Sequence, residues 1–183
     1  GHTDAQTGLG MMYQSGGEGV PENYEEALKW FRKAAEQGDA DAESGLGSMY
    51  RDGKGVPQDF IEAVIWYQKA SEKGNKGAQT SLGMMYQSGR EGFSKDYKEA
   101  GGWFQKAAEQ GCEIAQNFLG EMYLEGQGVP QDYALAHMWL NLAGANGYYS
   151  AVKSREVVEK KMTLSQVEEA QRLAREWVEK HPE

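Results

Sequence analysis

The chain has little cysteine, histidine or basic charge, and each shortage excludes a class of function. Its single cysteine, Cys112, excludes an intramolecular disulfide framework and a cysteine-based zinc site. The three histidines, His2, His137 and His181, are too far apart in the sequence to suggest a ligand cluster. A net charge of −9 without any basic run argues against nucleic acid, because that binding depends on Lys and Arg neutralising phosphates. We therefore expect no metal, no cofactor and no nucleic-acid partner.

Long apolar runs are absent too. No stretch approaches the ~20 apolar residues that a membrane span needs, and no charged, then apolar, then small-residue leader is present. We expect no membrane insertion. Residues 1–4 are either a non-native remnant or the start of the first helix, so the compartment stays open. The bacterial periplasm or the exterior would fit if an export signal had been removed.

What the chain does have is a repeated phrase, Ala-x-x-x-Leu-Gly-x-Met-Tyr. It occurs at residues 5–13, 42–50, 78–86 and 115–123, with spacings of 37, 36 and 37 residues. A fixed period of this size indicates a solenoid, in which each unit is one supersecondary element and stacking of the units creates the core. Such architectures bind other molecules far more often than they catalyse.

A second phrase follows each first one and is centred on a tryptophan. Asn or Asp stands seven residues before each tryptophan and Gly eight residues after it. The tryptophans are Trp30, Trp66, Trp103 and Trp139. We therefore divide the chain into four repeats and a cap, with boundaries at 5–41, 42–77, 78–114, 115–150 and 151–183.

Each repeat is predicted to form two helices. In the first helix, Ala42, Leu46 and Met49 recur at helical spacing and form one core-facing stripe. The second helix begins with a capping pattern, as at Asn23 and Glu26. We expect the tryptophan column to lie in the core. Left-handed caps are expected to end the first helices at Gly16, Gly53, Gly89 and Gly126.

After Gly147 the period stops and two further helices are predicted, over about 150–161 and from Thr163 to about Lys180. The apolar face of the last helix, from Val167 to Val178, is expected to cover the end of the stack. The sequence thus predicts an all-α protein. Its architecture is a right-handed α-solenoid of four helix-turn-helix repeats with a C-terminal helical cap.

The turn between the two helices carries a family resemblance. Residues 53–59 read Gly-Lys-Gly-Val-Pro-Gln-Asp and residues 126–132 read Gly-Gln-Gly-Val-Pro-Gln-Asp. Residues 5–150 resemble Sel-one-like repeats, a subclass of the tetratricopeptide-like solenoids. The resemblance implies a non-catalytic adaptor that holds protein partners in a concave groove lined by first helices, often in bacterial envelope assembly, host contact or signalling. The third repeat departs from the pattern, because residues 89–96 lack Val-Pro and Gly101-Gly102 interrupt a helix.

Helix geometry selects the candidate binding surface. Residues about half a turn from the core stripe of each first helix are expected to line the groove and to contact a peptide or protein partner. These are Thr7, Met11, Gln14, Ser44, Ser48, Arg51, Thr80, Met84, Gln87, Asn117, Glu121 and Leu124.

Two other functions remain open from the sequence. One is a binder or hydrolase of cell-wall-like small molecules, and the other is a structural spacer within a longer repeat protein. No carboxylate pairs with a recognisable second catalytic group, and the glycine-rich turns lack the Lys-Ser/Thr of a phosphate loop. We therefore expect no catalytic residues.

Overall fold

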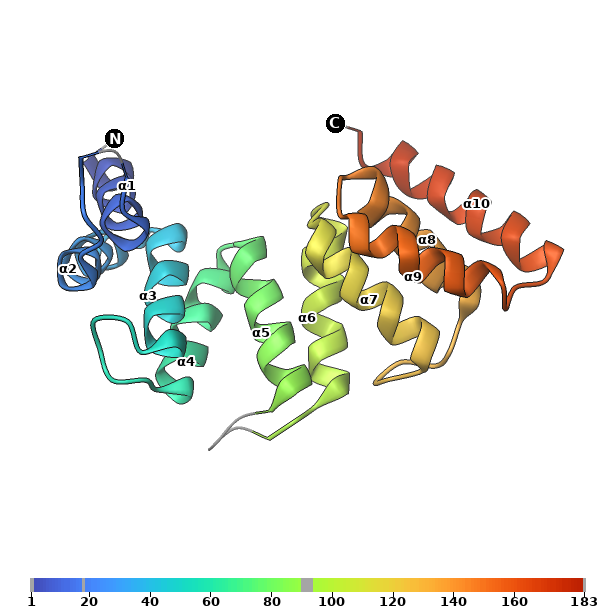
Figure 1. The fold of residues 1–183 in the computed structure, drawn as a ribbon, viewed down its shortest axis with the longest axis horizontal. Coiled ribbons are helices and arrows are strands. Elements are labelled where there is room, and N and C mark those ends of the chain that lie inside the picture. Colours follow the sequence, from blue (N-terminus) through green and yellow to red (C-terminus); the bar gives the residue numbers. More distant parts are fainter. Residues whose placement is uncertain (1, 18, 90–93, 183) are drawn as a thin grey trace. The chain divides into compact units, whose positions relative to one another are not determined.

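The computed structural model describes residues 2–17, 19–89 and 94–182, and within them it contains ten helices and no strand. The predicted all-α class is confirmed. The chain divides into two compact units, residues 1–95 and 96–183, which are described separately. Unit 1 holds α1 (His2–Ser15), α2 (Tyr24–Ala35), α3 (Ala40–Asp52), α4 (Phe60–Glu72) and α5 (Lys76–Ser88). Unit 2 holds α6 (Tyr97–Glu109), α7 (Glu113–Glu125), α8 (Tyr133–Ala145), α9 (Tyr149–Glu159) and α10 (Leu164–Lys180), and both units appear in Figure 1.

The second helices begin where the caps predict. The side chains of Asn23, Asp59, Asp96 and Asp132 each accept a hydrogen bond from the backbone N–H three residues on. This satisfies one of the backbone donors that a helix start otherwise leaves unpaired. At α10 the reciprocal pair forms as well, because Thr163 N donates to Gln166 Oε1 while Gln166 N donates to Thr163 Oγ1.

Glycine ends the first helices in a conformation that other residues adopt rarely. Gly53 has φ 67° and ψ 32°, and Gly126 has φ 69° and ψ 30°, as a left-handed cap requires. The same expectation is wrong at Gly89, whose φ of 62° comes with a ψ of 158°. The turn that follows Gly89 departs from the repeat pattern, and its residues 90–93 lie outside the described part of the chain.

The second glycine of the turn lies against the preceding second helix. A Cβ built on Gly55 would come within 2.7 Å of the carbonyl oxygen of Tyr24, and one on Gly128 would come closer still to that of Tyr97. Both tyrosines are the first residues of their helices, α2 and α6. The Gly-x-Gly turn therefore fixes the distance between one repeat and the next.

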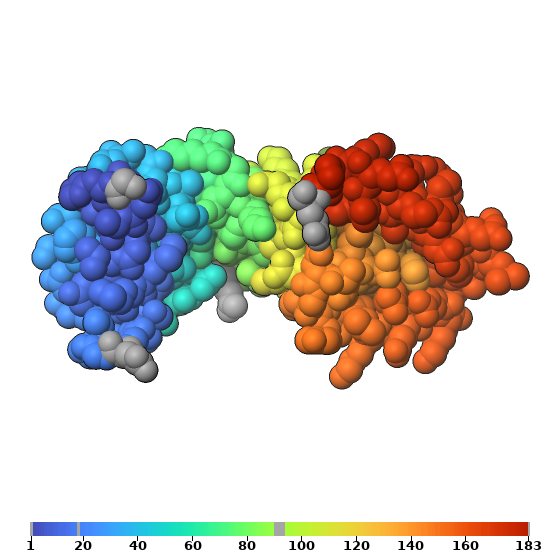
Figure 2. Space-filling model, turned by 90° about the horizontal axis from the view of Figure 1, so that it is seen from above, coloured from blue at the N-terminus to red at the C-terminus, as the bar shows by residue number. Residues whose placement is uncertain are grey.

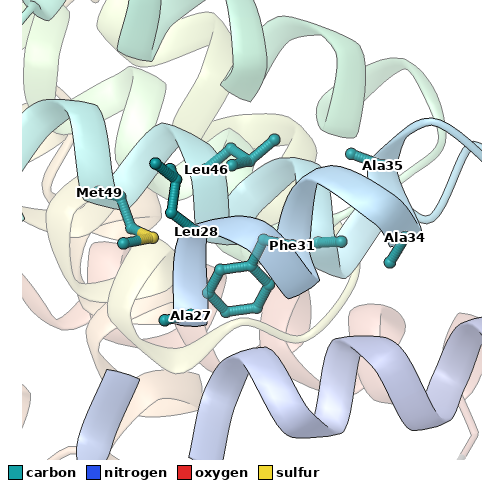
Figure 3. Packing of buried hydrophobic residues seen from close by; sticks show 8 residues of the cluster. Ala27, Leu28, Phe31, Ala34, Ala35, Leu46 and Met49 are labelled. Atoms are coloured by element: carbon teal, nitrogen blue, oxygen red, sulfur yellow. The ribbon is translucent and has the colours of Figure 1, made fainter. Parts of the chain in front are cut away.

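An aromatic ring fills the space between successive first helices. The ring of Phe31 on α2 lies between Gly10 of α1 and Gly45 of α3, so closely that a Cβ on either glycine would come within 2.9 Å of it. Phe31 is fully buried among Leu28, Leu46 and their neighbours (Figure 3). Absence of a side chain at these glycines is what allows the helices to approach.

The prediction that the tryptophan column lies in the core is wrong for three of its four members. Trp30, Trp66 and Trp103 are half-buried, whereas the next residue of each helix is fully buried. Lysine ammonium groups lie over the three indole rings, at 4.6, 4.1 and 4.1 Å from the ring centroids. Such cation–π contacts place these rings at the edge of the core. Only Trp139 is buried as predicted.

The C-terminal helices α9 and α10 pack on α8 in unit 2. Ala170 is fully buried and Trp177 meets Trp139 edge to face, with ring centroids 6.1 Å apart. Val178, which the sequence placed on the covering face, is 54% exposed. His137 is buried on α8, and its Nε2 atom lies 2.9 Å from Glu159 Oε1.

The two glycines inside α6 differ in their surroundings. Gly102 is exposed and has no atom within 4 Å of an added Cβ, whereas Gly101 is buried and its added Cβ would lie 3.2 Å from Met122 Cε. We expect Gly102→Ala to raise the free energy of unfolding by up to about 1 kcal/mol, because alanine is the better helix former. Urea unfolding checks this, with Gly101→Ala as the control expected to gain less. Destabilisation by Gly102→Ala would contradict it.

Candidate functional site

The predicted groove positions fall in both units. In unit 1 they lie on α1, α3 and α5, which neighbour one another in that order. Gln14 Nε2 donates to Ser48 Oγ at 3.1 Å, and Ser48 Oγ donates to the carbonyl oxygen of Gly45 at 2.8 Å. The first of these bonds links α1 to α3 through the predicted surface itself, and the second lies within α3.

Three of the twelve predicted positions are buried: Thr7, Thr80 and Asn117. Their side chains lie inside the structure and do not line a surface, so the expectation that they contact a partner needs correcting. Packing around each helix covers these three side chains, whereas Ser44, at the same repeat position, is half-buried. Helix phase alone cannot reveal that coverage.

The remaining positions are accessible to different degrees. Met11 is exposed, and Gln14, Ser44, Ser48, Arg51, Met84 and Gln87 are half-buried in unit 1. In unit 2, Glu121 accepts a hydrogen bond from Ser154 Oγ at 3.3 Å, and Leu124 packs against the apolar cluster around Leu140. The accessible part of the predicted surface therefore lies mainly in unit 1.

A cavity of about 550 Å³ opens on unit 1 beside this surface. It lies between the end of α3, the start of α4 and the C-terminal part of α5. Its lining combines an arginine fork, hydroxyl groups and methionines. The lining residues are Arg51, Asp52, Gln58, Phe60, Ser81, Met84, Met85 and Ser88. Of these, only Arg51 and Met84 belong to the positions that the sequence predicted.

Arg51 is held in place by its neighbours. Its Nε donates to Asp52 Oδ1 at 2.7 Å and its Nη2 to Asp52 Oδ2 at 2.9 Å. This hydrogen-bonded pair holds the pKa of Asp52 below its ordinary value and that of Arg51 above it. Gln58 Nε2 also donates to the Arg51 carbonyl oxygen at 2.7 Å. The guanidinium is therefore oriented before any partner arrives, with Nη1 outside the pair with Asp52.

The equivalent place in unit 2 is filled by apolar side chains. Leu124 occupies the repeat position of Arg51 and Tyr133 that of Phe60. Both pack against the cluster that contains Leu140 and Val158, and Met162 joins them. The open cavity is thus a property of residues 51–88 and not of every repeat.

The sequence did not lead us to single out a second set of polar residues, which lie buried on the first helices. Gln6, Glu43, Gln79 and Gln116 occupy one column of the first helices and are buried. Gln37 Nε2 donates to Gln6 Oε1 at 2.7 Å, and Lys73 Nζ lies 2.6 Å from Glu43 Oε1. These two bonds tie α1 and α3 to the residues that directly follow α2 and α4. The recurrence of Gln or Glu directly after each alanine was the signal available in the sequence.

Within 2–17, 19–89 and 94–182, no group of three or more His, Cys, Asp or Glu comes together to hold a metal ion. None of the helices formed by those residues is both long enough and apolar enough to cross a membrane.

The architecture defines a helical repeat protein, and comparison with known families identifies which kind. Four segments, residues 3–39, 40–75, 77–112 and 114–148, match the Sel1 repeat. The chain belongs to the Sel1 repeat family, whose members are generally non-catalytic scaffolds for protein interaction. A search of the curated proteins returned no match.

Solved structures of bacterial proteins share this fold. One is a protective antigen present in uropathogenic Escherichia coli strains and displaying an SLR fold, with a TM-score of 0.90 and 40% sequence identity over 98% of this chain. Another is a Sel1 repeat protein from Oxalobacter formigenes, with a TM-score of 0.74 and 39% identity over 85% of this chain. The chain spans 38% and 44% of the lengths of these two proteins.

Proposed function

We infer that this chain is a protein-binding scaffold whose main contact surface lies on unit 1, across the accessible faces of α1, α3 and α5. A peptide or protein segment is held there, with a side chain seated in the cavity beside Arg51 and Met84. The observation that carries this proposal is the open cavity of about 550 Å³, at a place that Leu124 and its neighbours close in unit 2. The family supports the general role, and the particular surface is our proposal.

The chemistry of the cavity indicates what it accepts. Met84 and Met85 offer flexible, polarisable surface that adapts to different apolar side chains. Arg51 offers a donor from a guanidinium already oriented by Asp52. Pre-organisation of this kind lowers the entropy lost on binding. The occupant is therefore a segment with an apolar side chain and a nearby hydrogen-bond acceptor, such as a backbone carbonyl or a carboxylate.

The predicted groove positions in unit 2 support this proposal less than those in unit 1. Glu121 and Leu124 are half-buried and are engaged with α9 and the apolar cluster. Thr7, Thr80 and Asn117 act through packing, because their side chains are buried. The proposal therefore rests on Met11, Gln14, Ser44, Ser48, Arg51, Met84 and Gln87.

The test is a binding measurement with the cavity removed. Peptides selected from a random display library on the wild-type chain are titrated against the double variant Arg51→Ala, Met84→Ala. We expect the affinity to fall at least about tenfold, because Arg and Met anchors in a well-packed pocket each contribute roughly 1–4 kcal/mol. Stability should change by only about ±0.5 kcal/mol per site, as for surface substitutions.

A matched control removes one cation and one exposed apolar residue elsewhere on unit 1. Lys29 pairs with Glu26 on α2, and Ile65 is exposed on α4, so Lys29→Ala with Ile65→Ala repeats the chemical change away from the cavity. This control should leave the affinity unchanged. Equal losses in the two double variants, or no loss in either, would count against the surface on α1, α3 and α5.

A further inference from the structure

A second cavity, of about 500 Å³, opens in unit 2 between α8, α9 and α10. Figure 2 shows α10, in red, beside the orange atoms of α8, on which it packs. This cavity shares no residue with the one beside Arg51, which belongs to unit 1. Its lining has a polar wall on α8 and α9, made of His137, Asn141, Arg155 and Glu159.

Contacts between α8 and α9 hold the charged groups of the polar wall together. Arg155 Nη1 donates to Asn141 Oδ1 at 2.7 Å. Glu159 Oε1 lies 2.9 Å from His137 Nε2 and 3.3 Å from Arg155 Nε. The atoms Arg155 Nη2, Asn141 Nδ2 and Glu159 Oε2 take part in none of these contacts. Two donors and one carboxylate oxygen are therefore left to meet a bound molecule.

His137 stands in this wall at a position that two earlier repeats fill with apolar residues. Leu28 and Val64 occupy the same position of α2 and α4 and are buried. His137 is buried too, and burying a polar group costs free energy unless a partner such as Glu159 satisfies it. The polar wall is therefore a property of α8 and α9 and is not a feature of every repeat.

The α10 side of the cavity offers apolar surface. Val167, Ala170 and Ala174 line it and recur at helical spacing on one face of α10. Ala170 is fully buried and the other two are half-buried. The short alanine side chains leave room for an apolar group of a ligand. A concave site with apolar surface and a few fixed polar groups is typical of small-molecule binding.

We propose that this cavity binds a free α-amino acid with an apolar side chain. Its carboxylate accepts hydrogen bonds from Arg155 Nη2 and Asn141 Nδ2, and its ammonium group pairs with Glu159 Oε2. Its side chain lies on Ala170 and Ala174. Arg155 and Glu159 carry one charge of each sign, so a dipolar ligand complements both, whereas an anion or a cation alone meets a like charge. Because Asn141 already orients the guanidinium, less entropy is lost on binding.

Calorimetric titration of the full chain with L-leucine tests the proposal. We expect saturable binding at one site and a rise in Tm of at least about 2 °C at about ten times the Kd. Isocaproate lacks the ammonium group and isopentylamine lacks the carboxylate, and each should bind at least about tenfold more weakly. Equal affinity for leucine and either fragment would overturn the dipolar ligand. Absence of leucine binding would leave the polar wall as a tie between α8 and α9 alone.

Variants locate the binding within the chain. Ala174→Leu narrows the cavity without changing the polar wall and should weaken leucine binding at least about fivefold, with circular dichroism checking that it folds. Arg155→Gln should weaken binding as well, whereas Arg175→Gln, exposed on α10 outside the cavity lining, should not. The double variant Arg51→Ala, Met84→Ala should also bind leucine normally, which separates this site from the proposed peptide surface. Unchanged affinity in Ala174→Leu would overturn the proposal.

Discussion

Replacing Phe31 by alanine is expected to lower the free energy of unfolding by about 3–5 kcal/mol, the range for a fully buried large aromatic side chain. The ring fills the space between Gly10 and Gly45, neither of which has a side chain that could move into the cavity left behind. The loss should therefore lie near the upper end of that range. Denaturant unfolding followed by circular dichroism measures it.

The matched control for this prediction is the adjacent residue. Trp30 is half-buried, with Lys33 Nζ 4.6 Å from its ring centroid, so Trp30→Ala leaves a gap that opens toward solvent. We expect it to cost clearly less than Phe31→Ala. A larger loss for Trp30→Ala would mean that the tryptophan column carries the core, as the sequence pattern first suggested.

Substituting alanine for Gly128 is expected to lower the free energy of unfolding by about 2–5 kcal/mol. The φ of +70° is costly for any residue with a Cβ, at about 1–3 kcal/mol. The new Cβ would also overlap the backbone carbonyl of Tyr97, and the resulting overpacking adds about 1–3 kcal/mol. Backbone at the start of α6 cannot yield as the tip of a long side chain can.

Gly19→Ala provides the comparison for that prediction. Gly19 has a similar φ of +81° but no atom within 4 Å of an added Cβ, so only the conformational cost applies. Thermal unfolding of the two variants separates the costs. Equal losses at Gly19 and Gly128 would show that the contact between the turn and the preceding helix adds nothing to stability.

Much of the candidate site could not be predicted from the sequence. Helix phase selected Arg51 and Met84, and the structure places both of them in the lining of the cavity. It could not indicate that Thr7 and Thr80 are buried, because the distance between neighbouring first helices depends on the residues that pack between them. It also could not indicate that Leu124 packs against an apolar cluster, whereas Arg51, at the same repeat position, lines a cavity.

Sequence alone determined the period, the helix pairs and most of the caps. These depend on local chemistry, such as the Asn23 side chain accepting a bond from the backbone three residues on, and that chemistry repeats with the sequence. Tertiary structure decided which residue of each aromatic pair is buried. Trp30 and Phe31 are adjacent and both large and apolar, and Phe31 is the core residue because Gly10 and Gly45 leave room for its ring. Contacts between helices set that choice, so no single helix contains the information that makes it.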